Sequence, residues 1–427
     1  MARLAAILTL GCKLNLADSE EIAHGLRRSG YQVVDRLCEA DAYVINTCSV
    51  THVADAKSRK LIRSVRRLSP GAPITVTGCY PQSAGFDAAA ELGADLVAGT
   101  RDADKRQLVM FLAEHGPAAP PAAPASTPLH TRAFVKAQEG CNDVCAFCIV
   151  PRTRGREESR SIDAVAAEVN RAVEDGAREV VITGTQLGAW GRDVDLPLQP
   201  RHLIAGILER TEVLRLRFSS LQPQDITPEL LGLWHDPRLM PHFHLALQSG
   251  SESTLRAMRR RYTAAEFRDA AARIKAAVPG AAITTDVIAG FPGESDEDFE
   301  ATFAFCRHVG FARLHCFPYS PRARTTAARL PGQLPPEAKQ ERMARLLALS
   351  EELSLAFRAE HAGAVRPVLW ESERPARGAE GPLWHGHTDN YIPVYAAGDA
   401  LLNRVTPVRL GEVYHDGVRG YSPMEAV

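Results

Sequence analysis

Short apolar runs alternate with stretches of helical period in the first part of the chain. The runs predict strands at residues 4–10, 42–46 and 74–77, and helices at residues 19–30 and 56–68. Strands that alternate with helices are typical of a parallel α/β sheet. We therefore expect residues 1–115 to form a parallel α/β domain. The next stretch, residues 116–128, is rich in Ala and Pro, has no hydrophobic period and is expected to be an extended linker.

The second part repeats the alternation of strands and helices over residues 129–360. Strands are predicted at residues 133–137, 180–183, 214–219, 243–247, 283–288 and 313–317, with helices such as 162–176 and 264–278 between them. Six β/α units predict an open, incomplete version of the eight-unit barrel. In such sheets the chemistry takes place at the carboxyl ends of the strands.

The last segment, residues 361–427, loses the helical period. Short β runs at residues 365–370, 391–395 and 403–410 predict a small β-barrel. The whole chain is therefore expected to be an α/β protein of three domains.

Composition narrows the class of protein. The 427 residues include 50 basic and 51 acidic side chains, so net charge indicates neither nucleic acid nor membrane as a partner. The hydrophobic fraction of 45% excludes a mostly disordered chain. Nine widely spaced cysteines do not resemble a secreted disulfide framework. With no apolar run near the roughly 20 residues of a membrane helix, we expect a cytoplasmic protein whose cysteines serve metal binding or catalysis.

One cysteine triplet follows the first predicted strand of the central segment. Cys141, Cys145 and Cys148 are spaced Cys-x3-Cys-x2-Cys. Three thiolates on one loop can hold three irons of a four-iron cluster and leave the fourth iron open, whereas electron-transfer clusters use four cysteines. A zinc loop with a distant fourth ligand is the alternative, although zinc loops usually pair their cysteines. A redox pair of Cys145 and Cys148 leaves Cys141 unexplained.

A second triplet is distributed along the first domain. Cys12, Cys48 and Cys79 each lie just past the end of a predicted strand. The carboxyl ends of parallel strands share one edge, so we expect these thiols to converge there and to hold a second cluster. Free cysteines also occur as small buried hydrophobes. That is the alternative for this triplet, and the interpretation that we favour for the remaining three cysteines, Cys38, Cys306 and Cys316.

Several motifs resemble one family. The spacing of Cys141, Cys145 and Cys148, with the aromatic Phe147 just before the third cysteine, resembles the cysteine motif of the radical S-adenosylmethionine superfamily. Residues 11–13, 46–51, 77–80, 248–251 and 286–294 are similar to motifs of the methylthiotransferases within that superfamily. The resemblance covers essentially the whole chain in order, including a final segment similar to a TRAM RNA-binding barrel.

The resemblance implies a division of labour between the two triplets. Cys141, Cys145 and Cys148 would hold a 4Fe-4S cluster that cleaves S-adenosylmethionine, while Cys12, Cys48 and Cys79 would hold a second 4Fe-4S cluster that carries sulfur. All six cysteines would then be catalytic. Two S-adenosylmethionine molecules would serve each turnover, as radical source and as methyl donor. A flavodoxin- or ferredoxin-like electron donor and a sulfur source are the implied protein partners.

Residues near predicted strand ends are candidates to hold S-adenosylmethionine. Glycine lets the backbone approach the adenosine, and Ser and Gln offer hydrogen bonds. Together with the aromatic beside the triplet, the candidates are Phe147, Gly184, Ser219, Ser220, Gln248, Ser249 and Gly290. Each polar or glycine candidate can also be an ordinary turn residue.

Local basic clusters indicate RNA. Residues 57–67 hold six basic side chains and no acid, which suits either a phosphate backbone or a solvated helix face. The RNA-binding candidates are Lys57, Arg59, Lys60, Arg63, Arg152, Arg154, Arg259 and Arg260. The segment from residue 363 has six basic and eight acidic side chains, so the last domain is expected to position RNA rather than anchor it.

The resemblance implies tRNA as the substrate. The motifs are most similar to members that add a methylthio group to C2 of N6-threonylcarbamoyladenosine beside the anticodon. The alternatives within the family are isopentenyladenosine in tRNA and an aspartate of a ribosomal protein. A non-catalytic RNA-binding protein that carries zinc or a cluster is the alternative from another class.

Overall fold

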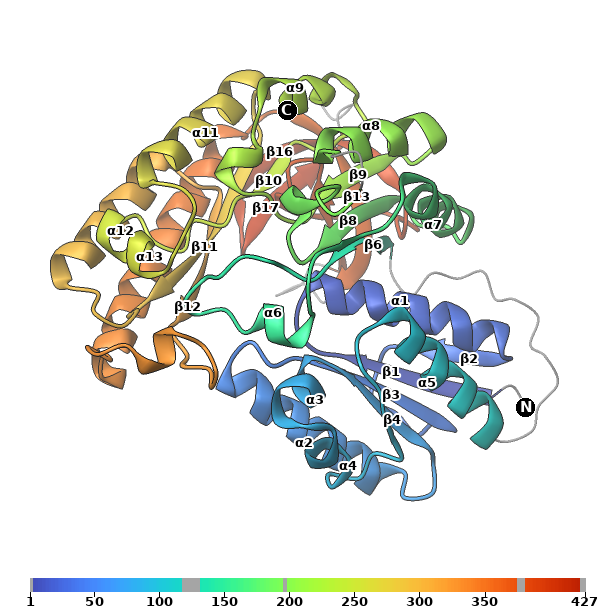
Figure 1. Cartoon of the computed structure of the whole chain (residues 1–427). Coiled ribbons are helices and arrows are strands. Elements are labelled where there is room, and N and C mark those ends of the chain that lie inside the picture. Colours follow the sequence, from blue (N-terminus) through green and yellow to red (C-terminus); the bar gives the residue numbers. More distant parts are fainter. Residues whose placement is uncertain (1–2, 117–130, 195–197, 375–380, 423–427) are drawn as a thin grey trace.

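The computed structural model describes residues 3–116, 131–194, 198–374 and 381–422. Its elements form an amino-terminal sheet, a central array of strands and a terminal barrel. In Figure 1 the amino-terminal part, in blue, lies below the central strands, and the terminal barrel, in red, lies behind them. The expected linker lies outside the described residues, apart from residue 116.

Five parallel strands form the amino-terminal sheet, in the order β2-β1-β3-β4-β5. The strands are β1 (Arg3–Thr9), β2 (Tyr31–Val34), β3 (Ala42–Thr47), β4 (Ile74–Gly78) and β5 (Leu96–Val97). Side chains of β1 alternate between two cores: Ala5 and Ile7 pack on one face, and Ala6 and Leu8 on the other. Because both faces are covered, these strands read as continuous apolar runs.

Helices cover both faces of this sheet. They are α1 (Lys13–Arg28) and α5 (Asp102–His115) on one face, and α2 (His52–Leu68), α3 (Cys79–Ala84) and α4 (Phe86–Ala90) on the other. Helix α1 begins six residues before the predicted start at Ser19. Its first turns bury the polar side chains of Asn15 and Asp18, which interrupt the apolar period on which the predicted start depended.

Six parallel strands form the central array and confirm the predicted open barrel. They are β6 (Arg132–Glu139), β8 (Glu179–Gly184), β9 (Arg215–Phe218), β10 (His242–His244), β11 (Ala282–Ala289) and β12 (Arg313–Pro318). The short β7 (Glu158–Ser159) adds an antiparallel edge to β6. Only isolated bridges, such as that of Leu221 with Leu245, join β9 to β10.

Helices cover the outer side of the central array. The long ones are α7 (Ile162–Glu174), α8 (Pro200–Arg210), α11 (Ala264–Ala277), α12 (Asp296–Val309) and α13 (Pro336–Glu360), with short α6 (Val150–Thr153), α9 (Pro228–Leu231) and α10 (Glu252–Ala257). On β11, Ile283 and Val287 pack in the core that these helices share, while Asp286 faces His244 on the other side. No helix in the described ranges is long and apolar enough to cross a membrane.

The terminal segment is a closed β-barrel, as predicted. Its strands are β13 (Val365–Arg374), β14 (Leu383–Thr388), β15 (Pro393–Ala396), β16 (Val405–Tyr414) and β17 (Gly417–Tyr421), in the order β13-β14-β15-β17-β16. Val368, Trp370 and Val394 fill its interior.

A buried carboxylate joins the terminal barrel to the amino ends of the central strands. Glu179, the first residue of β8, is fully buried and pairs with Arg132, Arg215 and Arg217. Arg217 Nη1 then donates to the carbonyl of Asp389 at 2.8 Å, in the turn after β14. The terminal barrel therefore closes the end of the central array that is opposite to the expected chemistry.

Candidate active site

The first cysteine group lies at the carboxyl edge of the amino-terminal sheet. Cys48 and Cys79 follow β3 and β4 directly, and Cys12 lies three residues beyond the end of β1. Gly11, before Cys12, adopts φ 107°, and a Cβ on it would come within 2.9 Å of the Cys48 Cβ. Glycine therefore lets the two cysteine-bearing loops approach each other. We call these three cysteines the sulfur triplet.

Burial keeps thiols of the sulfur triplet protonated. Burial, with smaller contributions from Cys79 and Cys12, raises the pKa of Cys48 to about 11, and burial also raises the pKa of Cys79. Metal binding displaces such protons. No group of three His, Cys, Asp or Glu side chains within the described part of the chain converges on a single ion. The donor set fits a four-iron cluster, in which each thiolate binds its own iron.

Arg154 connects the sulfur triplet to the central domain. Its Nη1 donates to Asp18 Oδ2 at 2.6 Å and to Glu139 Oε1 at 2.9 Å, its Nη2 contacts Asn15, and its side chain also hydrogen-bonds to Cys79. Arg154 is only 2% exposed. The prediction of an RNA contact at Arg154 is therefore wrong, because its guanidinium is enclosed and engaged by protein groups.

The second cysteine group lies in the loop between β6 and α6, and we call it the radical triplet. The amide of Cys148 donates to the carbonyl of Cys145 at 3.1 Å, and the amide of Cys141 donates to Gly155 at 3.0 Å. Burial, with smaller contributions from the neighbouring thiols, raises the pKa of Cys148 to about 12. Three thiols on one short loop fit the open-iron cluster that the spacing predicts.

Two polar side chains contact the radical triplet. Arg260 Nη1 donates to Cys145 Sγ at 3.1 Å, and Gln186 Oε1 lies 2.8 Å from Cys141 Sγ. Arg260 was predicted to bind RNA, and the structure places it at the radical triplet instead. Gln186 was missed, although it lies two residues beyond the candidate Gly184.

Four of the candidates for S-adenosylmethionine binding lie at the carboxyl ends of neighbouring strands. Gly184 ends β8, Ser219 and Ser220 follow β9, and Gln248 follows β10. Beside them, the side-chain hydroxyl of Thr185 and the Nε2 of Gln186 are buried and have no hydrogen-bond partner among the described residues. Buried polar atoms are rarely left unpaired, so this edge fits a polar ligand such as S-adenosylmethionine.

The other three candidates have roles within the fold. The Ser249 hydroxyl is fully buried and lies 2.9 Å from Thr302 Oγ1, so a cofactor contact by that side chain is not supported. Gly290 adopts φ 75°, and its amide donates to Glu294 Oε2 at 2.7 Å, as in a strand-to-helix turn. Phe147 packs in a small apolar cluster behind the radical triplet.

Titratable side chains of β10, β11 and β12 that the sequence analysis did not single out as site residues contact one another. His244 Nε2 lies 3.3 Å from Asp286 Oδ2, and the rings of His244 and His315 are 5.6 Å apart. Burial, with a smaller contribution from His244, lowers the pKa of His315 to about 4. Lys13, directly after Cys12, is close enough to Asp286 for each to shift the pKa of the other.

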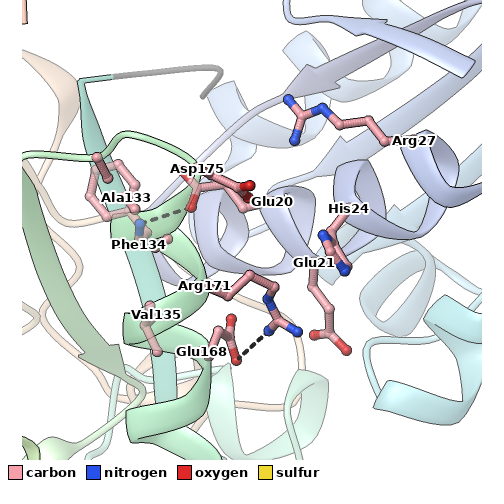
Figure 2. Close-up of a pocket in the computed structure, with 12 residues that line it drawn as sticks. Glu20, Glu21, His24, Arg27, Ala133, Phe134, Val135, Glu168, Arg171 and Asp175 are labelled. Atoms are coloured by element: carbon pink, nitrogen blue, oxygen red, sulfur yellow. Dashed lines mark hydrogen bonds and ion pairs between the residues drawn. The ribbon is translucent and has the colours of Figure 1, made fainter. Parts of the chain in front are cut away.

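A separate pocket lies where α1 meets β6 and α7 (Figure 2). Glu20 accepts a hydrogen bond from the amide of Phe134 at 2.9 Å, and Glu168 faces Arg171 across 4.0 Å. Burial raises the pKa of Glu20 to about 8. The lining residues include none of the predicted site residues, so this pocket belongs to a domain contact rather than to the cysteine triplets.

The basic side chains of α2 form an exposed surface. Lys57, Lys60 and Arg63 are exposed, and Arg59 lines a surface depression with Lys60 and Arg63. The only acid of this helix, Asp55, is held by Arg322 at 2.7 Å. Of the other RNA-binding candidates, Arg152 and Arg259 are also exposed. These residues are therefore placed where a phosphate backbone can reach them.

Family comparisons match both halves of this site. Residues 4–99 match an uncharacterised protein family, UPF0004, and residues 135–306 match the radical SAM superfamily. The radical S-adenosylmethionine methyltransferase TsrM from Kitasatospora setae has the same fold, with a TM-score of 0.56 and 14% identity, over 88% of this chain and 82% of that one.

Two tRNA-modifying enzymes are similar to this chain over nearly the full length of both proteins. Threonylcarbamoyladenosine tRNA methylthiotransferase MtaB from Bacillus subtilis is 36% identical over 96% of this chain and 95% of that protein. The tRNA-2-methylthio-N(6)-dimethylallyladenosine synthase from Syntrophobacter fumaroxidans is 33% identical over 98% of this chain and 95% of that protein. The radical SAM match covers the central domain that carries the radical triplet. Because these relatives match the chain over nearly its whole length, the chain belongs to the methylthiotransferase family of radical S-adenosylmethionine enzymes.

Proposed function

We propose that this enzyme adds a methylthio group to C2 of N6-threonylcarbamoyladenosine beside the anticodon of tRNA. The observation that carries the proposal is a match of 36% identity over nearly the whole chain to a relative named for that nucleoside. The exposed basic surface of α2 supports a tRNA substrate.

The two cysteine triplets support two cofactors with separate roles. We propose that the radical triplet and the sulfur triplet each hold a 4Fe-4S cluster, and that two S-adenosylmethionine molecules serve as radical source and methyl donor. Arg260 and Gln186 contact two thiols of the radical triplet and orient that loop. Arg154 joins the loop that carries Cys79 to Glu139 at the end of β6, and so holds the triplets in one arrangement. Enclosure by protein protects a carbon radical from water.

We propose that functional units follow residues 1–115, 129–360 and 361–427, joined first by the linker at 116–128. In this proposal the terminal barrel positions tRNA while α2 supplies phosphate contacts. An electron donor of flavodoxin or ferredoxin type and a sulfur source complete the cycle, in the cytoplasm where tRNA is modified.

Anaerobic reconstitution with defined RNA tests the proposal. The enzyme is given anticodon stem-loops that carry either threonylcarbamoyladenosine or isopentenyladenosine, and the nucleosides are analysed by mass spectrometry. We expect a methylthio product only from the first RNA. A product only from the second would assign the enzyme to the alternative substrate, for which the Syntrophobacter relative is the supporting observation. An aspartate of a ribosomal protein is the third substrate to include.

The division of labour is tested by single cysteine variants. We expect Cys12→Ala to keep cleaving S-adenosylmethionine and to transfer no sulfur, because Cys12 belongs to the sulfur triplet alone. Cys141→Ala should lose both activities. Equal loss of both activities in the two variants would contradict separate roles.

A further inference from the structure

One cation beside the sulfur triplet has no partner in the protein. Lys13 follows Cys12 at the start of α1, and its side chain is largely surrounded by protein while it keeps some accessible surface. It makes neither a hydrogen bond nor an ion pair with any residue that the structure describes. An enclosed ammonium group without a partner is costly, so an anionic ligand at this position would be stabilised.

The charged neighbours of Lys13 belong to the central strands. Its charge interacts with Asp286 on β11, and Asp286 interacts in turn with Tyr262. Tyr262 OH accepts a hydrogen bond from Arg260 at 3.0 Å, and Arg260 contacts Cys145 of the radical triplet. Lys13 is therefore next to Cys12 of the sulfur triplet in the chain, and within electrostatic reach of the inner side of the central strands, where Arg217 and Arg132 act on it most strongly.

The carboxylates near Lys13 already have partners. Asp286 lies 3.3 Å from His244. Glu179 is held by the three arginines Arg132, Arg215 and Arg217. Neither carboxylate pairs directly with Lys13, so the lysine is free to bind an anion that the substrate supplies.

We propose that Lys13 binds the carboxylate of the threonyl group on the substrate adenosine and thereby sets substrate specificity. This inference rests on the proposed function. A threonylcarbamoyl group carries a free carboxylate, whereas a dimethylallyl group carries none and is wholly apolar. A site whose enclosed charge is paired only by the correct substrate rejects the analogue that lacks the partner.

The test compares two RNAs and four proteins. The RNAs are an anticodon stem-loop with threonylcarbamoyladenosine and the same RNA whose threonyl carboxylate is a carboxamide. The reconstituted wild-type enzyme, Lys13→Gln and Lys13→Arg are assayed for RNA affinity and for kcat/KM. Lys275→Gln, on the outer helix α11 and bonded to the carbonyl of Val309 at 2.6 Å, is the matched control.

We expect the wild type and the Lys275→Gln control to prefer the carboxylate RNA by about 10- to 100-fold, the range of a hydrogen bond to a charged group. Lys13→Gln should lose this preference, and Lys13→Arg should keep most of it. Iron content is measured alongside, because Lys13 adjoins Cys12. Equal wild-type affinity for both RNAs, or an unchanged preference in Lys13→Gln, would overturn the inference. A wild type that modifies only isopentenyladenosine would overturn the proposed function itself.

Discussion

Arg154 shows how one buried side chain can serve two domains. It contacts Asp18 from the amino-terminal domain and Glu139 from the central domain, and the three side chains are almost fully buried. Arg154 lowers the pKa of Asp18 below its usual range, although burial opposes that shift. The ion pairs therefore stabilise the contact between domains at neutral pH, and this contribution is lost only in strong acid, as pH falls through the lowered pKa.

Removal of this guanidinium should destabilise the enzyme strongly. Arg154→Gln leaves two buried carboxylates with weaker compensation, and breaking a buried ion pair typically costs about 3–5 kcal/mol. We expect thermal unfolding of the apo protein to begin at a clearly lower temperature. Arg152→Gln, two residues earlier and exposed, is the control and should unfold like the wild type. Equal melting temperatures for the two variants would contradict the role assigned to Arg154.

Glu20 should make stability depend on pH. Burial raises its pKa from 4.5 to about 8. Between these pH values the folded protein keeps the proton on Glu20, whereas the unfolded chain has released it. Its contribution to stability is therefore full below pH 4.5 and is lost as pH rises towards 8. Glu20→Gln keeps an oxygen that can accept from the Phe134 amide and has no proton to lose.

The variant should gain stability over the wild type between pH 5 and pH 8, on the order of a few kcal/mol for a shift of this size. Unfolding by denaturant at several pH values measures it. Glu174→Gln, on the exposed side of α7, is the control. A difference between Glu20→Gln and wild type that does not change with pH would contradict the assigned pKa.

Single residues also show what sequence can and cannot reveal. The six cysteines could be proposed as ligands because each follows a predicted strand or lies on one loop. Arg154 and Arg260 were assigned to RNA because charge in a sequence does not reveal its partner; in the fold they face Asp18 and Cys145. Lys13 entered only as part of the motif at residues 11–13, and Gln186 gave no signal, since their surroundings depend on how separate loops meet.

At the scale of elements, buried strands were the most predictable. Strands β1, β3, β4 and β11 follow the apolar runs to within one or two residues, because sheets covered on both faces require such runs. Helix α13 was missed, although Leu346, Leu349 and Leu353 are buried at helical spacing. Many charged residues separate them and dilute the apolar pattern. Strand β10 is shorter than predicted, because beyond His244 the chain makes only isolated bridges with its neighbours.

The junction of β4 and α3 requires a glycine at position 78. Gly78 adopts φ 95° immediately before Cys79, and a Cβ there would lie 2.3 Å from the carbonyl oxygen of Thr47. Gly78→Ala should cost about 1–3 kcal/mol in backbone strain, and displace Cys79. We expect lower stability and loss of the iron held by the sulfur triplet. Iron and sulfide analysis after reconstitution, together with thermal unfolding, measures both effects.

Gly71→Ala is the matched control for that substitution. Gly71 lies in the turn before β4, does not adopt a positive φ, and a Cβ on it would meet nothing within 4 Å. It should retain wild-type stability and iron content. Full iron content in Gly78→Ala would show that the sulfur triplet tolerates the displaced loop, and the role assigned to Gly78 would then be wrong.

At the scale of the whole molecule, two buried ion networks hold the three parts of the chain together. The network of Arg154 and Asp18 holds the amino-terminal domain at the carboxyl side of the central strands, and Glu179 with its arginines holds the terminal barrel at the amino side. The sequence predicted the three parts but not these contacts, because ion pairs between domains leave no periodic pattern.

The most direct test of the proposed function is nucleoside analysis of tRNA from cells that lack their own threonylcarbamoyladenosine methylthiotransferase and express this chain. We expect the wild type to restore the methylthio form of threonylcarbamoyladenosine, and neither Cys12→Ala nor Cys141→Ala to do so. Threonylcarbamoyladenosine that remains unmodified in cells with abundant, iron-loaded wild-type enzyme would contradict the proposed function, as would a normal amount of the methylthio form with either variant.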